Sequence, residues 1–367
     1  MKIIILSPDD DNHTAPIQWA LEKAGYTVAC WMGLAWTEAE QASLRFGRQT
    51  RVALGPHIVE PGDVVWIRRP ELPAANPNVS EADRKFAELE YRGFYHSIAY
   101  VLEKLPVWVI NRYSFSRFII HKAVQLVIAG ECGLKVAETL MSNSPAPVRD
   151  FVANNPHRVI CKAFTQHVWE RSDHTVAVTE TFELQRDRLP RDEVLTYAPA
   201  IYQDLIEKQF DVRMVIMGCH VYSYALHNPE GSLDWRQDAG QRRIRVDRIA
   251  TPPEIERAVL AFTQETGICF GSLDFAVDRQ GEWWFLEINE QGQFLWLDQF
   301  NPELKVQEKF CAFITAPQGS TEPLEKREGL FPPLAEYEEL VLRKELPPVD
   351  IKVSGSAGSM AFVSSEG

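Results

Sequence analysis

Apolar runs broken by short polar segments open the chain and predict a small α/β lobe. Residues 2–7 form one apolar run and residues 26–31 a second, which is the pattern of buried strands. A polar loop and a helical segment at residues 17–23 separate the two runs, and the helix ends near Gly25. The order strand, loop, helix, strand therefore indicates an open α/β lobe at the amino end.

The same alternation of strand and helix patterns continues through the middle of the chain. Further strands are predicted at residues 63–70, 107–111, 159–164, 199–206, 210–218 and 220–227. Helices are predicted at residues 80–105, 115–130 and 252–267, and a loop without glycine at residues 165–175. The tail after Ala316 is rich in Pro and Glu, and we expect its last dozen residues to be poorly ordered.

Near the carboxyl end, two strongly apolar strands predict a β-hairpin that carries three metal-type ligands. Residues 271–277 form the first arm, residues 283–289 form the second, and residues 278–282 have turn composition. Because side chains alternate along a strand, Glu287 and Asn289 point the same way.

The length of the turn sets the position of the third ligand, Asp274. A turn with an even number of residues, two or four, places Val277 opposite Glu282 and Asp274 opposite Phe285. Asp274 is then diagonal to Glu287 at roughly 7–8 Å, within joint reach of a pair of metal ions. A slip of one residue would turn Asp274 to the other face of the hairpin.

Two carboxylates and an amide offer only oxygen ligands, which suit Mg²⁺ and suit Zn²⁺ poorly. A Mg²⁺ ion held by few protein groups usually completes its shell with nucleotide phosphates. The alternative is that the acids are solvated, as on most hairpins. The strongly apolar neighbours favour the metal site, because acids in such strands are rarely buried without a partner or a metal.

Composition describes an ordinary soluble enzyme of two or three lobes. The chain has 367 residues, of which 45% are hydrophobic and 24% are charged. The net charge of −13 disfavours nucleic-acid binding. The six cysteines form no CxxC pair, which indicates reduced thiols and a cytoplasmic location. The apolar run at the amino end is too short for a signal peptide, and no run reaches membrane-spanning length.

Two basic residues lie inside apolar strands and suggest phosphate contacts. Burial of the Lys162 ammonium group without a partner costs free energy, and a phosphate is one such partner. The alternative is a lysine at a strand edge that extends its ammonium group to water. Arg213 could clamp a phosphoryl or carboxylate oxygen with its guanidinium, or could form an ion pair with Asp204 or Asp211.

Other motifs are either absent or ambiguous. The chain has no GxxxxGK[ST] and no GxGxxG after its first strand, so a P-loop and a dinucleotide fold are excluded. GxSxG and HExxH are also absent. A loop that begins at Asp234-Trp235-Arg236 holds four more arginines up to Arg248. It could attract an acidic substrate, or it could be a solvated charged loop.

The order of these features resembles the ATP-grasp superfamily. The residues that carry the resemblance are Lys122, Lys162, the connector at Gln203, Arg213, Asp274 and the Glu287-x-Asn289 pair. Within this superfamily, the sequence resembles in particular the graspetide-maturing ligases of the microviridin type. That closer likeness rests on Trp66-Ile67-Arg68-Arg69-Pro70, Ile201-Tyr202-Gln203, Asp211-Val212-Arg213, Asp234-Trp235-Arg236 and Phe285-Leu286-Glu287-Ile288-Asn289. Two departures are Glu290, where the family pattern has Pro, and the missing glycines after Lys162.

The resemblance implies a role for each matched residue. Lys122 and Lys162 would bind the phosphates of ATP, and Arg213 would contact the transferred phosphoryl group. The segment Gln203-Asp204-Leu205 would form the adenine hinge. Two Mg²⁺ ions would be bound by Asp274, Glu287 and Asn289. Arg236, Arg68 and Arg69 are expected to contact the substrate.

The resemblance also implies an α/β (α+β) ATP-grasp fold of three lobes with ATP between the last two. Residues 1–112 would form a pre-ATP-grasp α/β domain and residues 113–200 a linker helix and the central subdomain. Residues 201–315 would form the C-terminal subdomain with the metal site, and residues 316–367 an extension.

The implied activity is that of an ATP-dependent peptide macrocyclase. It would activate Asp or Glu side chains of a ribosomal precursor peptide, with a leader and an acidic core, as acyl phosphates. Ser or Thr hydroxyls, or Lys amines, would then form esters or amides, and the enzyme would be a homodimer. Two alternatives stay open: a ligase for a small molecule or for adding amino acids to a protein, and a non-catalytic peptide-binding homologue.

Overall fold

The structure, a computed structural model, describes residues 1–8, 10–165, 168–170, 176–178, 181–228, 233 and 244–347. Several expectations from the sequence lie outside these residues. They concern Arg236, Arg242 and Arg243 of the arginine-rich loop, part of the predicted loop at residues 165–175, and the end of the tail. No helix in the described part combines the length and the apolar composition needed to cross a membrane.

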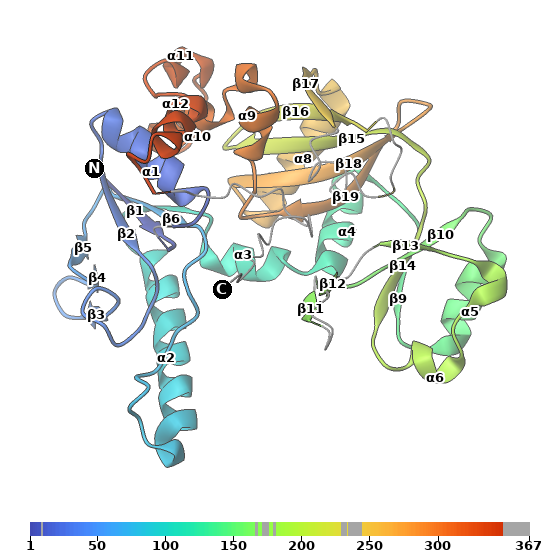
Figure 1. Cartoon of the computed structure of the whole chain (residues 1–367), viewed down its shortest axis with the longest axis horizontal. Helices are drawn as coiled ribbons and strands as arrows, with labels where there is room; N and C mark the ends of the chain where they lie inside the picture. Colours follow the sequence, from blue (N-terminus) through green and yellow to red (C-terminus); the bar gives the residue numbers. More distant parts are fainter. Residues whose placement is uncertain are drawn as a thin grey trace, which may run out of the picture.

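The amino-terminal lobe, predicted as an open α/β lobe, is built on a parallel sheet. Its order is β2-β1-β6-β7, from strands Thr27–Trp31, Lys2–Leu6, Val64–Ile67 and Trp108–Ile110. Helix α1 (Thr14–Lys23) connects β1 to β2, and helix α2 (Glu81–Leu102) extends away from the body (Figure 1).

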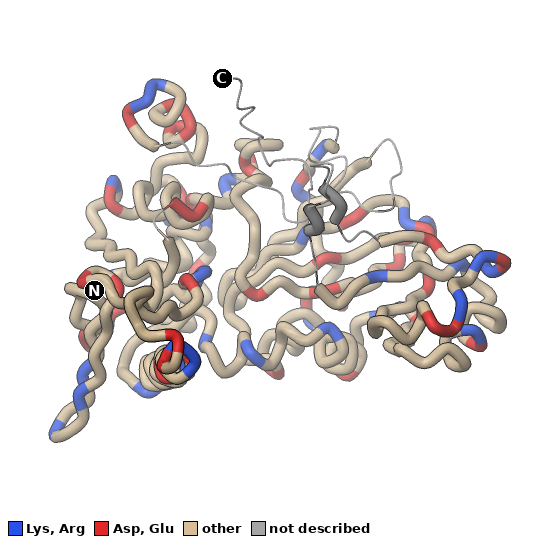
Figure 2. The backbone as a smooth tube through the Cα atoms, turned by 60° about the horizontal axis from the view of Figure 1, so that its bottom comes forward, with Lys and Arg blue, Asp and Glu red and all other residues tan. Residues whose placement is uncertain are grey.

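A three-stranded antiparallel sheet, which the sequence pattern did not predict, projects from this lobe. It consists of β3 (Ala42–Arg45), β4 (Arg51–Leu54) and β5 (His57–Val59). The β3–β4 hairpin forms the arm at the lower left of Figure 2.

The next segment differs from the prediction in two places. One helix was expected at residues 115–130, but the chain forms α3 (Tyr113–Ile119) and α4 (Lys122–Glu131). They are separated at His121, whose backbone is extended. Residues 168–170 form strand β11, paired with β12 (Val176–Val178), where a loop was predicted.

The central subdomain is a four-stranded sheet covered by short helices. Its order is β13-β10-β14-β9, from strands Phe182–Leu184, Val159–Lys162, Ala200–Asp204 and Thr139–Ser142. Helices α5 (Pro145–Asn154) and α6 (Asp192–Leu195) lie beside it, at the right of Figure 1.

A six-stranded sheet forms the centre of the molecule, in the order β17-β16-β15-β18-β19-β8. These strands are Arg245–Ile249, His220–His227, Lys208–Met217, Phe270–Asp278, Trp283–Asn289 and Lys135–Val136. Strand β8 belongs to the predicted central segment but joins this sheet, so the chain crosses between the two predicted subdomains.

The two faces of the six-stranded sheet have different cover. Val212, Met214 and Phe275 pack on one face against α4 and α8 (Pro253–Thr266). Val215 and Met217 pack on the other face, where α9 (Trp296–Phe300), α10 (Val306–Thr315) and α12 (Leu334–Leu342) join a core shared with the amino-terminal lobe. These helices cover only part of that face, and the remainder lines a cavity.

Asn111 ties the end of β7 to the central sheet. Its amide nitrogen donates to the carbonyl oxygens of Phe270 (2.6 Å) and Glu290 (2.7 Å). Its oxygen accepts from the backbone N–H groups of Cys269 (2.9 Å) and Phe270 (3.0 Å). The side chain is 4% exposed, so these four backbone groups depend on it for hydrogen bonds.

Arg68 and His13 form a second tie between the lobes. The Arg68 guanidinium is fully buried and donates to the carbonyl oxygens of Gln291 (2.8 Å) and Gly292 (3.0 Å). Its Nε lies 3.3 Å from Oδ1 of Asp11. Burial lowers the pKa of Arg68 to about 10. Substrate contact by Arg68, expected from the sequence, is therefore not supported, because the guanidinium is committed to the protein interior.

His13 holds the neighbouring part of the same loop. Its Nε2 accepts from the N–H groups of Phe294 (3.0 Å) and Leu295 (3.4 Å), and its Nδ1 lies 2.7 Å from Oδ1 of Asn12. Burial, with the nearby Arg68 cation, lowers the pKa of His13 well below its usual value. The neutral imidazole is therefore the form that the fold requires.

The first prediction concerns Asn111. Replacement of Asn111 by Ala should lower the free energy of unfolding by about 3 kcal/mol, because several buried backbone groups lose their partners. Chemical denaturation measures the change. Asn78→Ala, at an exposed loop position, is the matched control and should change little. Equal effects of the two variants would contradict the role assigned to Asn111.

The second prediction concerns His13 and pH. Its pKa is lower in the folded than in the unfolded chain, so its contribution to stability is present above pH ~6.5 and is lost as the pH falls. Between pH ~7 and ~5 the wild type should lose 1–2 kcal/mol, on that order, relative to His13→Gln. The glutamine can still accept a hydrogen bond but does not titrate. Parallel unfolding curves for both proteins across this range would rule the mechanism out.

Candidate active site

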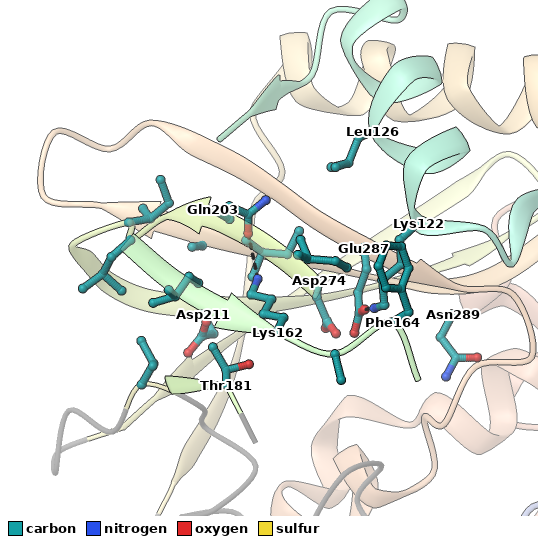
Figure 3. Close-up of a pocket in the computed structure, with 18 of the residues that line it drawn as sticks. Lys122, Leu126, Lys162, Phe164, Thr181, Gln203, Asp211, Asp274, Glu287 and Asn289 are labelled. Atoms are coloured by element: carbon teal, nitrogen blue, oxygen red, sulfur yellow. Dashed lines mark hydrogen bonds and ion pairs between the residues drawn. The ribbon is translucent and has the colours of Figure 1, made fainter. Parts of the chain in front are cut away.

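A cavity of about 530 Å³ lies between the central subdomain and the uncovered part of the six-stranded sheet. Most of the residues predicted to act together line this one space (Figure 3). They are Arg69, Lys122, Lys162, Gln203, Asp204, Leu205, Arg213, Asp274, Glu287 and Asn289.

The three metal-type ligands lie on two adjacent strands, in a register different from the predicted one. Val277 pairs with Trp283, so the ladder is shifted by one residue from the expected pairing with Glu282. Without correction this slip would turn Asp274 away from Glu287. A β-bulge between Asp274 and Phe275 restores the alignment, and Asp274 lies directly opposite Glu287.

The bulge brings the ligands closer than the diagonal arrangement expected from the sequence. Asp274 pairs across the ladder with Glu287, and Ser272 pairs with Asn289. Directly opposite residues on neighbouring strands have Cβ atoms about 4.5–5.5 Å apart. Asp274 is 4% exposed, so the alternative of a solvated acid is wrong for this residue.

Arg213 extends this row of charges to a third strand. It pairs with Asp274 in the β15–β18 ladder, and its Nη1 lies 3.2 Å from Oδ1 of Asp274. Both side chains are almost fully buried, and the guanidinium lies over the ring of Trp296 at 5.7 Å. The ion-pair partners considered from the sequence, Asp204 and Asp211, are not the residue that faces Arg213 in the ladder.

Asp211 and Lys208 form a neighbouring pair that also lines the cavity. Their charged atoms are 2.7 Å apart, and Lys208 donates to the carbonyl oxygen of Leu233 at 2.8 Å. Asp211 is 3% exposed and lies two positions before Arg213, on the same face of β15. The sequence had suggested Asp211 as a partner of Arg213 and did not indicate its pair with Lys208.

The two predicted lysines approach from opposite sides of the cavity. Lys122 is the first residue of α4, and its ammonium group pairs with the carboxylate of Glu287. Lys162 lies on β10 and donates to Oε1 of Gln203 at 2.7 Å. Lys162 is the last residue of β10 and pairs with Ile201 on β14, whereas the pairing with β13 ends at Cys161, so the alternative of a lysine at a strand edge stays open.

The predicted hinge runs along β14 and the residues that follow it. The Gln203 amide nitrogen donates to Oγ1 of Thr139 at 2.8 Å, and Gln203 is 3% exposed. The backbone N–H groups of Asp204 and Leu205 donate to the carbonyl oxygens of Glu138 (3.0 Å) and Arg158 (2.7 Å). These two N–H groups are therefore occupied by the protein itself, and Ile206 is the next residue along the wall of the cavity.

Gln125 holds the strand that carries two of the ligands. Strand β8 pairs with β19 only at Trp284 and Phe285. Farther along, the Gln125 side chain on α4 donates to the carbonyl oxygen of Ile288 (3.0 Å) and accepts from its N–H group (3.0 Å). Ile288 lies between Glu287 and Asn289, so this clamp fixes the orientation of both side chains. The sequence analysis missed it, because one glutamine on a helix gives no distinctive pattern.

The donor set fits Mg²⁺ in one specific way. The described residues hold no group of three or more His, Cys, Asp and Glu side chains placed to bind a metal. Asp274, Glu287 and Asn289 offer oxygen donors from adjacent strands, too few to fill an octahedral shell. A Mg²⁺ ion would therefore need further oxygens, such as those of phosphate groups, that fit in the same cavity.

Three arginines were predicted to contact the substrate. The structure describes two of them, Arg68 and Arg69, and of these Arg69 lines the cavity. Its Nε donates to Oε1 of Gln291 at 3.2 Å. Arg68, its neighbour, points into the interior, as expected for successive residues at the end of a strand. Gln293 also lines the cavity wall beside Arg69.

No family model matches the sequence, and no curated protein matches it. Solved structures do match. A RiPP-associated ATP-grasp ligase from Chryseobacterium gregarium, in complex with ADP and a leader and core peptide, is similar with a TM-score of 0.74. That match covers 88% of this chain and 99% of the other at 23% identity.

Two further structures are similar over most of their lengths. The macrocyclase MdnC from Microcystis aeruginosa, bound with precursor peptide MdnA, matches at 21% identity and TM-score 0.67 over 86% of this chain and 99% of its own. The ATP-grasp ligase PsnB, complexed with a minimal precursor, Mg and ADP, matches at 20% identity and TM-score 0.62 over 84% and 98%. The fold predicted from the order of the motifs is confirmed: the chain has the fold of the ATP-grasp ligases.

Proposed function

We propose that the protein is an ATP-dependent ligase that forms rings in a ribosomal precursor peptide. The observation that carries the proposal is the row Arg213, Asp274, Glu287 on three adjacent strands, with Lys122 and Lys162 facing the same cavity. Structures with this fold that hold ADP and peptides, described above, support the choice of a peptide substrate.

The residues divide into a nucleotide side and an acceptor side. Lys162 and Lys122 would neutralise the phosphates of ATP, and the hinge at Gln203–Leu205 would hold the adenine. Asp274, Glu287 and Asn289 would bind two Mg²⁺ ions, which offset phosphate charge and polarise the transferred group. Arg69 would contact the peptide carboxylate, and Arg236, which lies outside the described residues, is proposed for the same side.

The reaction has two steps. A carboxylate oxygen of an Asp or Glu side chain attacks the γ-phosphorus, and the bond to ADP breaks. A Ser or Thr hydroxyl, or a Lys amine, of the same peptide then attacks the acyl phosphate, loses its proton and releases phosphate. Arg213 would stabilise the charge that develops on the transferred group, which is often the largest catalytic contribution.

Existing ion pairs indicate how the site accepts its ligands. Lys122 pairs with Glu287, one of the proposed metal ligands. Mg²⁺ and phosphate together would satisfy both partners, since the cation replaces Lys122 at Glu287 and the phosphate replaces Glu287 at Lys122. Binding of the nucleotide alone would leave Glu287 facing a phosphate, so the metal and the nucleotide should bind together.

We further propose a cytoplasmic homodimer. All six cysteines lie in the described part of the chain and none forms a disulfide there, which suits a reducing compartment. The dimer surface proposed is an apolar stripe on α2 that contains Phe86 (66% exposed), Leu89 (55%) and Tyr100 (47%). These residues share one face of the helix, while Ile98 and Leu102 pack inward.

Gly93 lies within the same stripe and supports the approach of a second helix. A glycine in a helix interior costs about 1 kcal/mol relative to alanine. A Cβ atom at Gly93 would have no heavy atom within 4 Å, so no contact within the described part of the chain requires the glycine. A helix from a second copy could approach closely at this point.

The third prediction tests the ligase. Glu287→Gln should reduce Mg²⁺-dependent ATP turnover in the presence of peptide by at least about a hundredfold, because one metal ligand loses its charge. Glu282→Gln, in the turn of the same hairpin, is the matched control and should remain active. Mass spectrometry of a candidate peptide should show the loss of one water per ring.

Two outcomes would contradict the proposal. Turnover that survives Glu287→Gln at the wild-type level would exclude the metal site. ATP-dependent ligation of free amino acids, with no modification within the peptide, would exclude the macrocyclase in favour of a different ligase.

The fourth prediction tests the dimer surface. Leu89→Glu should shift the protein from twice the chain mass to the chain mass in light-scattering measurements, because a charge would be buried at the centre of the stripe. Leu72→Glu, at another exposed apolar residue, should leave the mass unchanged. A wild-type protein that is monomeric at micromolar concentration would rule this surface out.

A further inference from the structure

The β3–β4 hairpin has one face in the core and one face outward. Two of its four residue pairs, Ala42 with Leu54 and Leu44 with Val52, pack against the core of the amino-terminal lobe. The outward face carries the other two pairs, Ser43 with Ala53 and Arg45 with Arg51. Because side chains alternate along each strand, these four residues form one continuous surface.

A hollow of about 570 Å³ lies over the first of these outward pairs. Small residues form most of its wall, among them Ala39, Ser43 and Ala53. Glu38 is its acidic member. The hollow shares no lining residue with the candidate active-site cavity, so a ligand here would leave that cavity open.

The wall of the hollow is held by Gly55. Its φ of +54° is a conformation that other residues rarely adopt. Its N–H group donates to the carbonyl oxygen of Gln41 at 2.7 Å. A Cβ atom here would lie 2.2 Å from the carbonyl oxygen of Ala39, so a larger residue cannot fit. The hollow is therefore a preformed feature of the fold.

Next to the hollow, the outward face is strongly basic. Arg45 and Arg51 are both exposed and lie directly opposite one another, and Arg48 lies in the turn between them. Like charges placed directly opposite destabilise a hairpin. No described residue forms a salt bridge with any of the three arginines, and residues 41–59 contain no Asp or Glu.

This basic surface stands out on an acidic protein. The net charge of the chain is −13, yet the charged positions on the β3–β4 arm in Figure 2 are all basic (blue). Phe46 lies beside Arg45 and is 66% exposed. An anionic partner would relieve the repulsion between Arg45 and Arg51, and an extended chain could also cover Phe46.

The free edge of β3 determines what shape of partner fits. The strand order β3-β4-β5 leaves β3 without a neighbour on its outer side within the described residues. An exposed edge presents backbone groups that can pair with an added strand. A peptide in an extended conformation would place every second side chain on the outward face.

We propose that this hairpin binds an acidic, extended segment of the peptide substrate, at a second site separate from the catalytic cavity. A carboxylate of the segment pairs with Arg45 and Arg51, and a small apolar side chain two residues away enters the hollow. Glu38 disfavours a second carboxylate there, which sets the direction of the segment. The assignment of the partner as the substrate rests on the proposed function, whereas the binding chemistry does not.

The fifth prediction uses a fluorescein-labelled decapeptide, Glu-Thr-Val-Thr-Glu-Thr-Val-Thr-Glu-Thr, in which a valine lies two residues from each glutamate and so on the same face of the extended chain. Fluorescence anisotropy should show binding that weakens about tenfold in the double variant Arg45→Gln/Arg51→Gln, because two charge-assisted contacts are lost. The double variant Arg84→Gln/Arg279→Gln, at exposed arginines elsewhere, is the matched control and should bind as the wild type does. Ala53→Phe, which fills the hollow without a change of charge, should also weaken binding.

Further measurements separate this proposal from the proposed function. Basal Mg²⁺-dependent ATP turnover should be the same in the wild type and in the Arg45→Gln/Arg51→Gln variant, so a protein without turnover can still bind the probe. Binding should be absent with the same decapeptide in which lysine replaces each glutamate. Equal binding by the hairpin variant and the wild type, or full displacement of the probe by a single-stranded oligonucleotide at equal concentration, would overturn the proposal.

Discussion

The ion pair between Arg213 and Asp274 is the interaction on which the rest of the site depends. Both side chains lie inside a sheet that is covered on its opposite face by α4 and α8, so neither charge could be buried alone. Removal of one partner from such a pair typically costs about 3–5 kcal/mol, because the other charge is left without compensation. The pair therefore forms a charged part of the cavity wall. Glu287 on the next strand and Lys122 on α4 form a second ion pair beside it.

Three side chains hold in place the strand that carries Glu287 and Asn289 and the loop that follows it. Gln125 fixes Ile288 between two of the proposed ligands, Asn111 binds the carbonyl oxygen of Glu290, and Arg68 binds the two carbonyl oxygens that follow. Each clamp comes from a segment far away in the sequence. The chain that carries the ligands is therefore positioned by the amino-terminal lobe and by α4, rather than by the hairpin alone.

The sequence was enough to predict the fold class and to name most of the residues that line the cavity. Both predictions depend on strong local patterns and on the order of motifs. What it could not predict depends on tertiary context. The split of one expected helix at His121 places Lys122 at the start of α4, and no glycine or proline marks that break. The register of the hairpin combines a slip with a compensating bulge, and alternation alone cannot reveal either. Arg68 and Arg69 are adjacent and chemically alike, yet only the packing decides which one faces the cavity.

Charge balance explains why a metal should accompany the nucleotide. Five basic and four acidic side chains line the cavity, and several of them are already paired with one another. A nucleoside triphosphate adds several negative charges, which this nearly balanced set cannot offset without additional cations. Glu290, which follows the last proposed ligand, acts in the same direction. Its backbone carbonyl makes the bond to Asn111 that a proline there could also make, whereas its side chain places an acid near Arg68 and Arg69. Burial raises the pKa of that carboxyl. In its ionised form this carboxyl lowers the positive electrostatic potential around Arg69, one of the residues proposed to contact the substrate.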